Sequence, residues 1–383
     1  MKKTVRIIII FAIILFSNCQ KIFSQDSSRI RISLLTCTPG EELYSIFGHS
    51  AIRIIDSNNV TDYIYNYGTF NFDDNGFYLK FIRGKLLYFV SIERTEDFLA
   101  FYTSENRGIA EQILQLTGDE KIAIQKALKE NLKEENKYYK YDFFLDNCTT
   151  RLRDVISNKK YPKPLLPLVM PASTTYRNAI HQYLDKGGQK WSELGIDILL
   201  GMPTDKIMTA SEQQFLPDNL MTTIDSCKNI LLVKEKTTLY SPIKNEEKKD
   251  WTTPMNCFSL LLLFIIFLSL SKNIAIQKML PYFDFMLFFT IGIIGVLLIL
   301  MWCATDHSMT KNNFNLCWAL PTHLYASFLI FSKKSFAKKY FLFTSMLMAA
   351  LLLVWLVLPQ ELNSALIPIV LLIGLRSYQR SKS

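Results

Sequence analysis

The chain has 383 residues, of which 49% are hydrophobic and 20% charged, with 14 Gly and 13 Pro. This composition excludes disordered and collagen-like chains, because the apolar fraction is high and no glycine period or proline tract occurs. The net charge of +9 comes from the two ends, since residues 26–255 carry 29 basic and 31 acidic side chains. A nucleic-acid-binding domain would need a basic surface of its own, so we expect no nucleic acid partner.

The N-terminus has the order of a secretory signal. Lys2, Lys3 and Arg6 precede an apolar run over residues 7–16, and small or polar residues come after the run. The run is too short to span the ~30 Å of hydrocarbon in a bilayer. We therefore predict a signal peptide over residues 1–25, which exports the next domain of the chain.

An α+β domain with an antiparallel sheet is predicted over residues 26–235, followed by a charged linker over 236–255. Alternating, β-branched or aromatic runs predict strands, and a capping-box spacing at Thr117 predicts the start of a helix. Residues 49–55 and 60–67 flank a polar turn and form a hairpin signature. The expected strands are 29–37, 49–55, 60–67, 77–83 and 86–92, and the expected helices are 95–106, 117–136 and one that begins at 147–148.

The C-terminal part is predicted to be an α-helical membrane domain over residues 256–376, with a cytoplasmic tail over 377–383. Five apolar segments have or approach the length that a bilayer requires. With the preceding domain exported, nine basic residues fall in the cytoplasmic loops and tail and one, Lys311, falls outside. This positive-inside bias predicts a multi-pass protein of the inner (cytoplasmic) membrane with its N-terminal domain in the periplasm. The segments are 256–271, 285–303, 317–332, 341–358 and 364–375.

Cys148 is the candidate nucleophile of the exported domain. It follows Asn147, a residue suited to the N-cap, and opens a predicted helix. A helix N-terminus stabilises a thiolate, and Arg151 one turn later could add to this effect. The alternative is a small buried core cysteine, a common environment for this residue type.

His49 and Asn66 are the candidate partners of that thiol. His49 begins an Ile-rich strand after Gly48, and a turn centred at 57–58 would place it opposite Asn66. An amide there could orient the imidazole, giving a Cys–His–Asn arrangement. Tyr65 and Tyr67 remain competitors, because they point to the other face and the register is uncertain by a residue or two. A strand-end or surface histidine and a turn-forming asparagine are the alternatives.

Other polar residues carry weaker predictions. Arg53 and Arg107 could bind a phosphate headgroup, although structural ion pairs are commoner. Ionisable groups at a membrane boundary can mark a function, the alternative being a solvated loop. His323 is either a hydrogen-bond partner between membrane helices or part of the same site. The loop residues in question are Asp306, His307, Asn312, Asn313 and Asn315. The candidate substrate- or lipid-binding residues are Arg53, Tyr65, Tyr67, Asp306, His307, Asn312, Asn315 and His323.

Metal ligands and disulfides are not indicated by spacing. The four histidines are scattered, and the absence of Cys-x-x-Cys and His-x-x-x-His argues against a metal; no cofactor is expected. Cys37 and Cys227 could form a bridge, which the sequence leaves open. His181 lies in an amphipathic helix and is expected to be surface or core, whereas Asp197 and Asp205 are expected to shape turns.

Several motifs resemble one family. Residues 47–53 (FGHSAIR), 65–70 (YNYGTF), 146–154 (DNCTTRLRD) and 195–205 (GIDILLGMPTD) resemble the periplasmic domain of the Lnb family of lipoprotein N-acyltransferases. The membrane part continues the likeness with TDH at 305–307, NNFN at 312–315 and WALPTH at 318–323. The exported domain also resembles, more distantly, circularly permuted papain-like enzymes of the NlpC/P60 kind, in which the histidine strand precedes the cysteine helix.

The resemblance implies transfer of an acyl chain, with a phospholipid as donor, to the N-terminal amine of a diacylated lipoprotein. Cys148 matches the nucleophile of the family and His49 its base, whereas Asn66 is proposed from hairpin geometry alone. The oxyanion would be held by the Cys148 backbone N–H and the Asn147 amide. Two other functions stay open: a membrane-tethered cysteine peptidase or amidase acting on cell-wall peptide, and a non-catalytic lipid- or lipoprotein-binding module.

Overall fold

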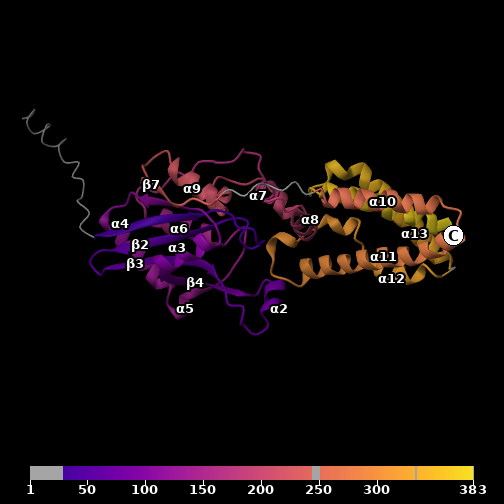
Figure 1. Ribbon diagram of the computed structural model, residues 1–383, viewed down its shortest axis with the longest axis horizontal. Helices are drawn as coiled ribbons and strands as arrows, with labels where there is room; N and C mark the ends of the chain where they lie inside the picture. The colour runs from indigo at the N-terminus through magenta and orange to yellow at the C-terminus, as the bar shows by residue number, and fades with distance from the viewer. Residues whose placement is uncertain (1–28, 244–250, 333, 383) are drawn as a thin grey trace, which may run out of the picture.

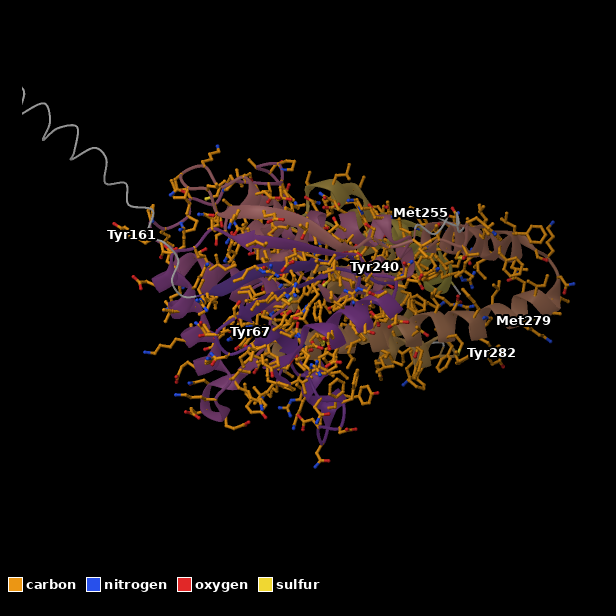
Figure 2. The ribbon with its side chains drawn as sticks, turned by 60° about the vertical axis from the view of Figure 1, so that its left-hand side comes forward. Tyr67, Tyr161, Tyr240, Met255, Met279 and Tyr282 are labelled. Atoms are coloured by element: carbon orange, nitrogen blue, oxygen red, sulfur yellow. The ribbon has the colours of Figure 1, made fainter. Side chains whose placement is uncertain are left out.

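The computed structural model describes residues 29–243, 251–332 and 334–382, so the predicted signal peptide lies outside the described residues. The sheet and its helices form one end of the elongated molecule, and a bundle of long helices forms the other (Figure 1). Tyr67 lies within the sheet half, whereas Met279 and Tyr282 project at the far end of the bundle (Figure 2). An α+β domain followed by a helical region is therefore confirmed.

A seven-stranded antiparallel sheet forms the core of the N-terminal domain, in the order β6-β4-β3-β2-β1-β5-β7. Strands β2 and β3 form the predicted hairpin, with Ile52 paired to Tyr65. This register differs by two residues from the predicted one, and a shift of two keeps every side chain on its expected face. The strands are β1 (Ile30–Cys37), β2 (His49–Asp56), β3 (Thr61–Thr69), β4 (Leu87–Arg94), β5 (Ile109–Leu114), β6 (Tyr138–Lys140) and β7 (Val233–Tyr240).

Helices cover both faces of this sheet. On one face α4 (Gly118–Asn131), α6 (Cys148–Lys159) and α9 (Pro217–Asp225) bury apolar side chains against alternate residues of the central strands. On the other face α3 (Thr95–Ser104) packs Phe98 and Tyr102 on Ala51 and Ile64. Successive side chains of the central strands point to opposite faces of the sheet, so each face carries its own apolar layer. Burial of both layers stabilises the sheet between the helices.

Three sequence predictions for this domain are wrong. Residues 77–83, predicted as a strand, form the short helix α2 (Phe77–Ile82). Strand β5 was not predicted, and β7 extends into the predicted linker, so the domain continues to Tyr240. β5 and β7 pair with each other, and β5 carries polar residues within an otherwise apolar pattern, which weakened the strand signal. The three-residue strand β6 was not predicted either.

Helices α7 (Tyr176–Lys186) and α8 (Lys190–Leu199) lie between the sheet and the bundle (Figure 1). After α8 the chain pairs by its backbone with the loop that follows the longest bundle helix: the N–H of Gly201 donates to the carbonyl of Met309 at 2.8 Å. A Cβ on Gly201 would lie 1.9 Å from the carbonyl oxygen of Lys311, so only glycine permits this approach. A short helix α5 (Glu134–Lys137) precedes β6.

The C-terminal helices follow the predicted segments, but not all of them span a membrane by length. They are α10 (Pro254–Leu270), α11 (Ile274–Cys303), α12 (Thr322–Leu329), α13 (Ser335–Val354) and α14 (Ile367–Lys382). Within the described residues, two spans are long and apolar enough to cross a bilayer, 274–303 and 335–357, against the five predicted. α14 continues through the predicted tail to Lys382.

These helices run alternately away from and toward the sheet domain. The turn near Ser271 and the end of α14 lie at the far end, where Arg376 donates to Asp284 at 2.8 Å and to Ser269, also at 2.8 Å. α12 packs closely on α11, because a Cβ at Gly292 would lie 2.2 Å from the Leu324 nitrogen. The loops between α11 and α12 and between α13 and α14 therefore face the sheet domain (Figure 1).

Candidate active site

Cys148 is the first residue of α6, and Asn147 caps that helix. The side-chain oxygen of Asn147 accepts the backbone N–H of Thr150 at 2.9 Å, and its amide donates to the carbonyls of Phe143 and Phe215. Because both amide interactions are with the protein, Asn147 positions the thiol and is not free to bind an oxyanion. The backbone N–H groups of the first turn and the helix dipole favour negative charge on the sulfur.

His49 is the first residue of β2, and its ring meets Asn66 of β3. The Nε2 atom of His49 lies 3.1 Å from the Oδ1 atom of Asn66. Since an amide oxygen only accepts, Nε2 carries a proton and Nδ1 is left to exchange a proton with the thiol. The sequence predicted Asn66 directly opposite His49. The observed register differs by two residues, so Asn66 lies diagonally across from His49 on the same face of the sheet.

The pKa values of the thiol and the imidazole move toward each other. Burial raises the pKa of Cys148, but the charge and hydrogen bond of His49 and the backbone N–H of Ser50 outweigh burial and lower the pKa to about 7. Burial lowers the pKa of His49, whereas the Cys148 charge and the hydrogen bonds that the ring donates to Cys148 and Asn66 raise it above its ordinary value. The pair therefore favours thiolate and imidazolium near neutral pH.

Glu93 of β4 extends the arrangement by one residue. The amide nitrogen of Asn66 donates a short hydrogen bond to Glu93, which fixes the orientation of the amide and presents its oxygen to His49. Burial raises the pKa of Glu93, while the Asn66 hydrogen bond and the His49 charge oppose that rise. Cys148, His49, Asn66 and Glu93 thus form a row of side chains from four elements, α6, β2, β3 and β4.

A second thiol and an aromatic ring lie on the other side of the imidazole. Cys37 of β1 pairs in register with His49, and burial raises its pKa, so it stays protonated. Tyr102 stacks on His49 with ring centroids 6.4 Å apart, and the Arg107 guanidinium lies 4.6 Å from the Tyr102 centroid. Cys37 and Cys227 are both free, so the disulfide that the sequence left open is absent.

Arg151 and the two tyrosines of β3 are structural neighbours of α6. Arg151 forms a bidentate ion pair with Asp146 at 2.7 Å and lies 3.5 Å from the centroid of Tyr139. Tyr65 and Tyr67 are buried in the core, and the Tyr67 hydroxyl accepts from Asn131 at 2.6 Å. These contacts correct the predicted lipid contact of the tyrosines, because their rings pack under the helix.

Arg53 does not offer its guanidinium to a phosphate. It forms ion pairs with Asp62 at 2.5 Å and Glu111 at 3.3 Å, and these contacts raise its pKa. Its side chain is largely covered by the sheet. Since the two carboxylates already satisfy its donors, the predicted headgroup-binding role of Arg53 is wrong.

The loop after α11 docks onto the sheet domain. Asp306 pairs with Lys140 at 2.9 Å, and the His307 ring donates to the carbonyls of Phe81 and Ile82 at 3.1 Å. The hydroxyl of Ser308 donates to Asp142 at 2.7 Å, six residues before the thiol. These predicted lipid-binding residues therefore join the two halves of the molecule.

Two asparagines of this loop, Asn313 and Asn315, also join the two halves through their side chains, whereas within the described residues the side chains of Asn312 and His323 do not. Asn315 is buried and donates to the carbonyl of Asp197 at 2.9 Å, while Asn313 donates to Ile198 at 2.8 Å. Asn312 is exposed in a left-handed conformation. His323 is buried in the bundle and accepts from the Tyr340 hydroxyl at 2.7 Å, which favours the interhelical alternative.

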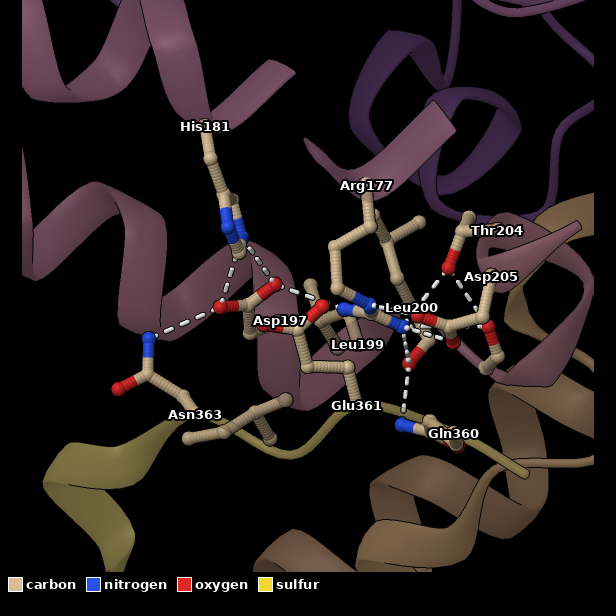
Figure 3. A network of polar contacts seen from close by, with 12 residues as sticks. Arg177, His181, Asp197, Leu199, Leu200, Thr204, Asp205, Gln360, Glu361 and Asn363 are labelled. Atoms are coloured by element: carbon tan, nitrogen blue, oxygen red, sulfur yellow. Dashed lines mark hydrogen bonds and ion pairs between the residues drawn. The ribbon is translucent and has the colours of Figure 1, made fainter. Parts of the chain in front are cut away.

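A buried polar network lies where the two halves meet (Figure 3). Asp197 accepts from Arg177 at 2.7 Å, from His181 at 2.9 Å and from Asn363 of the bundle at 2.8 Å. Arg177 also pairs with Asp205 at 2.8 Å. The prediction that Asp197 and Asp205 only shape turns is therefore wrong, because both neutralise a buried arginine.

His181, Glu193 and Asp197 bring potential ligand atoms within 4.8 Å of one another, the arrangement that a metal site needs. The Arg177 guanidinium already forms an ion pair with Asp197 at 2.7 Å, and its positive charge lies beside these three residues. A divalent cation would compete with that charge, so the residues fit an ion-pair network better than a metal centre.

Sequence reasoning missed Glu93, Tyr102 and Cys37 as neighbours of His49. Each lies on a different element, and only the pairing of β1 with β2 and of β3 with β4 brings them together. For Cys37 a weak signal was present, because β1 and β2 are consecutive strands and consecutive strands often pair. The position of Tyr102 depends on how α3 packs and has no signature in the sequence.

Two family models match the chain. The model of the Lnb N-terminal periplasmic domain matches residues 21–182, which include Cys148, His49 and Asn66. The model of the Lnb transmembrane domain matches residues 246–381. No curated protein and no solved structure matches the chain.

Proposed function

The chain belongs to the Lnb family, with a periplasmic domain followed by a transmembrane domain in the inner membrane, and on this premise we propose that it is a lipoprotein N-acyltransferase. The donor is a phospholipid, and the acceptor is the N-terminal amine of a diacylglyceryl-cysteine lipoprotein. The observation that carries this proposal is the thiol of Cys148 at a helix N-terminus, with a pKa of about 7 beside His49.

Acylation of the enzyme is the first half of the reaction. The Cys148 thiolate attacks an ester carbonyl of the phospholipid and forms a carbon–sulfur bond while the carbonyl oxygen gains negative charge. Backbone N–H groups at the start of α6 offer donors for that oxygen. The ester carbon–oxygen bond then breaks, His49 gives its proton to the leaving oxygen, and a thioester and a lysophospholipid result.

Transfer to the lipoprotein is the second half. The amine attacks the thioester carbonyl, His49 takes a proton from the nitrogen, and the carbon–sulfur bond breaks to give an amide and the thiolate. Asn66 and Glu93 are positioning residues, because they hold the imidazole through hydrogen bonds and do not touch the reacting atoms. Burial of Cys148 limits hydrolysis of the thioester by water.

Both substrates reach the site from the bilayer, because each is anchored there by its acyl chains. We include all five C-terminal helices in this membrane domain, the two long spans together with the shorter α10, α12 and α14. The shorter helices pack on the spans and on loops that face the sheet domain. Their role is to hold the thiol domain at the outer surface of the membrane.

The test uses the full chain in detergent micelles with a diacylated lipopeptide and phospholipid. Mass spectrometry should show a gain of one acyl chain on the peptide amine with the parental protein and with Cys227→Ala, a control that removes a thiol away from the site. Cys148→Ala should show none. Turnover by Cys148→Ala would contradict the mechanism, and cleavage of cell-wall peptide without acylation would contradict the function.

A further inference from the structure

Residues 70–85 form an aromatic segment that leaves the sheet between β3 and β4 and contains α2. Its apolar side chains point away from the domain: Tyr78 is 76% exposed and Leu79 62%, and Phe72, Phe81 and Ile82 are also exposed. Exposure of such a surface to water is unfavourable, and contiguous exposed apolar side chains mark a binding surface. α2 projects beyond the sheet on the side of α11 (Figure 1).

The aromatic segment lies at the level where the membrane span α11 ends. α11 ends at Cys303, and three residues later the N–H of Asp306 donates to the carbonyl of Arg83 at 2.9 Å. The His307 ring contacts the carbonyls of Phe81 and Ile82 at 3.1 Å. The aromatic segment is therefore held directly at the end of α11 that is nearer the sheet domain (Figure 1).

Positive charge accompanies the apolar surface. Lys140 pairs with Asp306, and the charges of Lys85 and Arg83 also act on that carboxylate and lower its pKa. The charges of three cationic side chains thus act on one carboxylate. The excess of positive charge at the membrane boundary matches the phosphate groups of lipid headgroups.

A row of packed rings leads from the aromatic segment toward the thiol. Phe77 of α2 lies 5.8 Å from Phe70, Phe70 lies 5.3 Å from Tyr88, and Tyr88 stacks on Tyr141 at 4.4 Å between centroids. Tyr141 and Cys148 both border Gly68, where an added Cβ would lie 3.4 Å from the Tyr141 ring and 3.8 Å from the Cys148 Cβ. The inner end of the row therefore reaches the reactive residue.

We propose that the aromatic segment inserts into the outer leaflet of the phospholipid bilayer and leads a lipid acyl chain along the row of rings to Cys148. Insertion covers the exposed side chains of α2 and places the basic side chains at the headgroups. The insertion does not depend on the chemistry at the thiol. The delivery of the acyl chain rests on the proposed acyltransferase function.

Insertion is tested with the full chain in nanodiscs that contain phospholipids brominated in their acyl chains. Tryptophan is introduced as Leu79→Trp in α2 or, as the matched control, as Val60→Trp in the exposed turn between β2 and β3. After subtraction of the parental signal, quenching by brominated lipid should be several-fold stronger for Leu79→Trp. Equal quenching of the two positions would overturn the insertion.

Delivery is tested with Leu79→Asp and, as the matched control, Ile122→Asp on the exposed side of α4. Leu79→Asp should lose most acyl transfer from nanodisc phospholipid, yet still form the Cys148 thioester from a short water-soluble ester at the parental rate. Ile122→Asp should match the parental protein in both assays. Parental transfer by Leu79→Asp would overturn delivery, whereas a parental protein that acylates nothing would overturn the proposed function and leave the quenching result intact.

Discussion

Two histidine-centred clusters in the same chain differ in how fully their polar atoms are satisfied. His181 donates to Asp197, whose oxygens also accept from Arg177 and Asn363, so the carboxylate has no vacant position. His49 donates to an amide and faces a thiol whose pKa it lowers. The comparison teaches that a network whose polar atoms all have hydrogen-bond partners holds elements of the fold together. A group with a shifted pKa and few partners is instead available for chemistry.

The largest expected effect separates the two histidines by activity. His49→Ala should reduce acyl transfer about 100- to 10,000-fold, because it removes the group that exchanges protons with the thiol and the substrates. His181→Gln keeps a donor toward Asp197 and should change the rate little. Initial rates from mass spectrometry of the lipopeptide check both. Equal losses in the two variants would remove the distinction drawn between the clusters.

The next effect concerns how much the buried network around Asp197 contributes to stability, in comparison with an exposed ion pair. Arg177→Met should destabilise the protein by about 3–5 kcal/mol, because Asp197 and Asp205 would keep charge beside a buried apolar side chain. Lys206→Met removes one partner of an exposed ion pair with Glu212 and should cost about 0–1 kcal/mol. Unfolding midpoints measured in detergent should fall clearly for the first variant only. An unchanged midpoint in Arg177→Met would show that the network is not a structural clamp.

A smaller effect concerns the pH dependence of the thiol. The thiolate forms above the pKa of Cys148, so alkylation by iodoacetamide should accelerate as pH rises, with its midpoint near pH 7. In His49→Ala the midpoint should move to higher pH, because burial remains and the neighbouring positive charge is lost. Peptide mapping of the alkylated residue gives the rate at each pH. A midpoint that stays near pH 7 in His49→Ala would assign the low pKa to the helix alone.

The smallest effect is expected at the exposed contacts of the junction. Asp306→Asn removes the ion pair with Lys140 but leaves the backbone hydrogen bond of residue 306 to Arg83. Because the pair is open to water, the unfolding midpoint should stay within measurement error of the parental value. A clear decrease would mean that the junction depends on exposed charge as much as on the buried network.

The sequence predicted the hairpin and the three members of the candidate triad, because these depend on local signals. A Gly before His49, an N-cap before Cys148 and a short turn between two strands act within a few residues of each site. The junction network could not be predicted in this way. Arg177, Asp197 and Asn363 are far apart in the chain, and only docking of the two halves brings them together.

The boundaries of the membrane helices also could not be predicted from local sequence signals. Apolar runs located all five helices, but packing decides their ends: α12 stops after eight residues, and α14 continues past Arg376 because that side chain pairs with Asp284. Residues 77–83 were predicted as a strand because aromatic and β-branched residues are frequent in strands. They form the short helix α2, and their exposed apolar side chains fit the proposed contact of that helix with the bilayer.

The backbone pairing of Gly201 with Met309 has a mechanical consequence. Side chains can rotate to lengthen a contact, whereas two main chains in direct contact keep a constant spacing. In the proposed membrane arrangement, sheet and bundle would therefore move as one rigid unit, and the Cys148 sulfur would keep a fixed distance from the bilayer. We expect selection among ester bonds to follow how far each rises from the hydrocarbon, which lipids with graded linker lengths would measure.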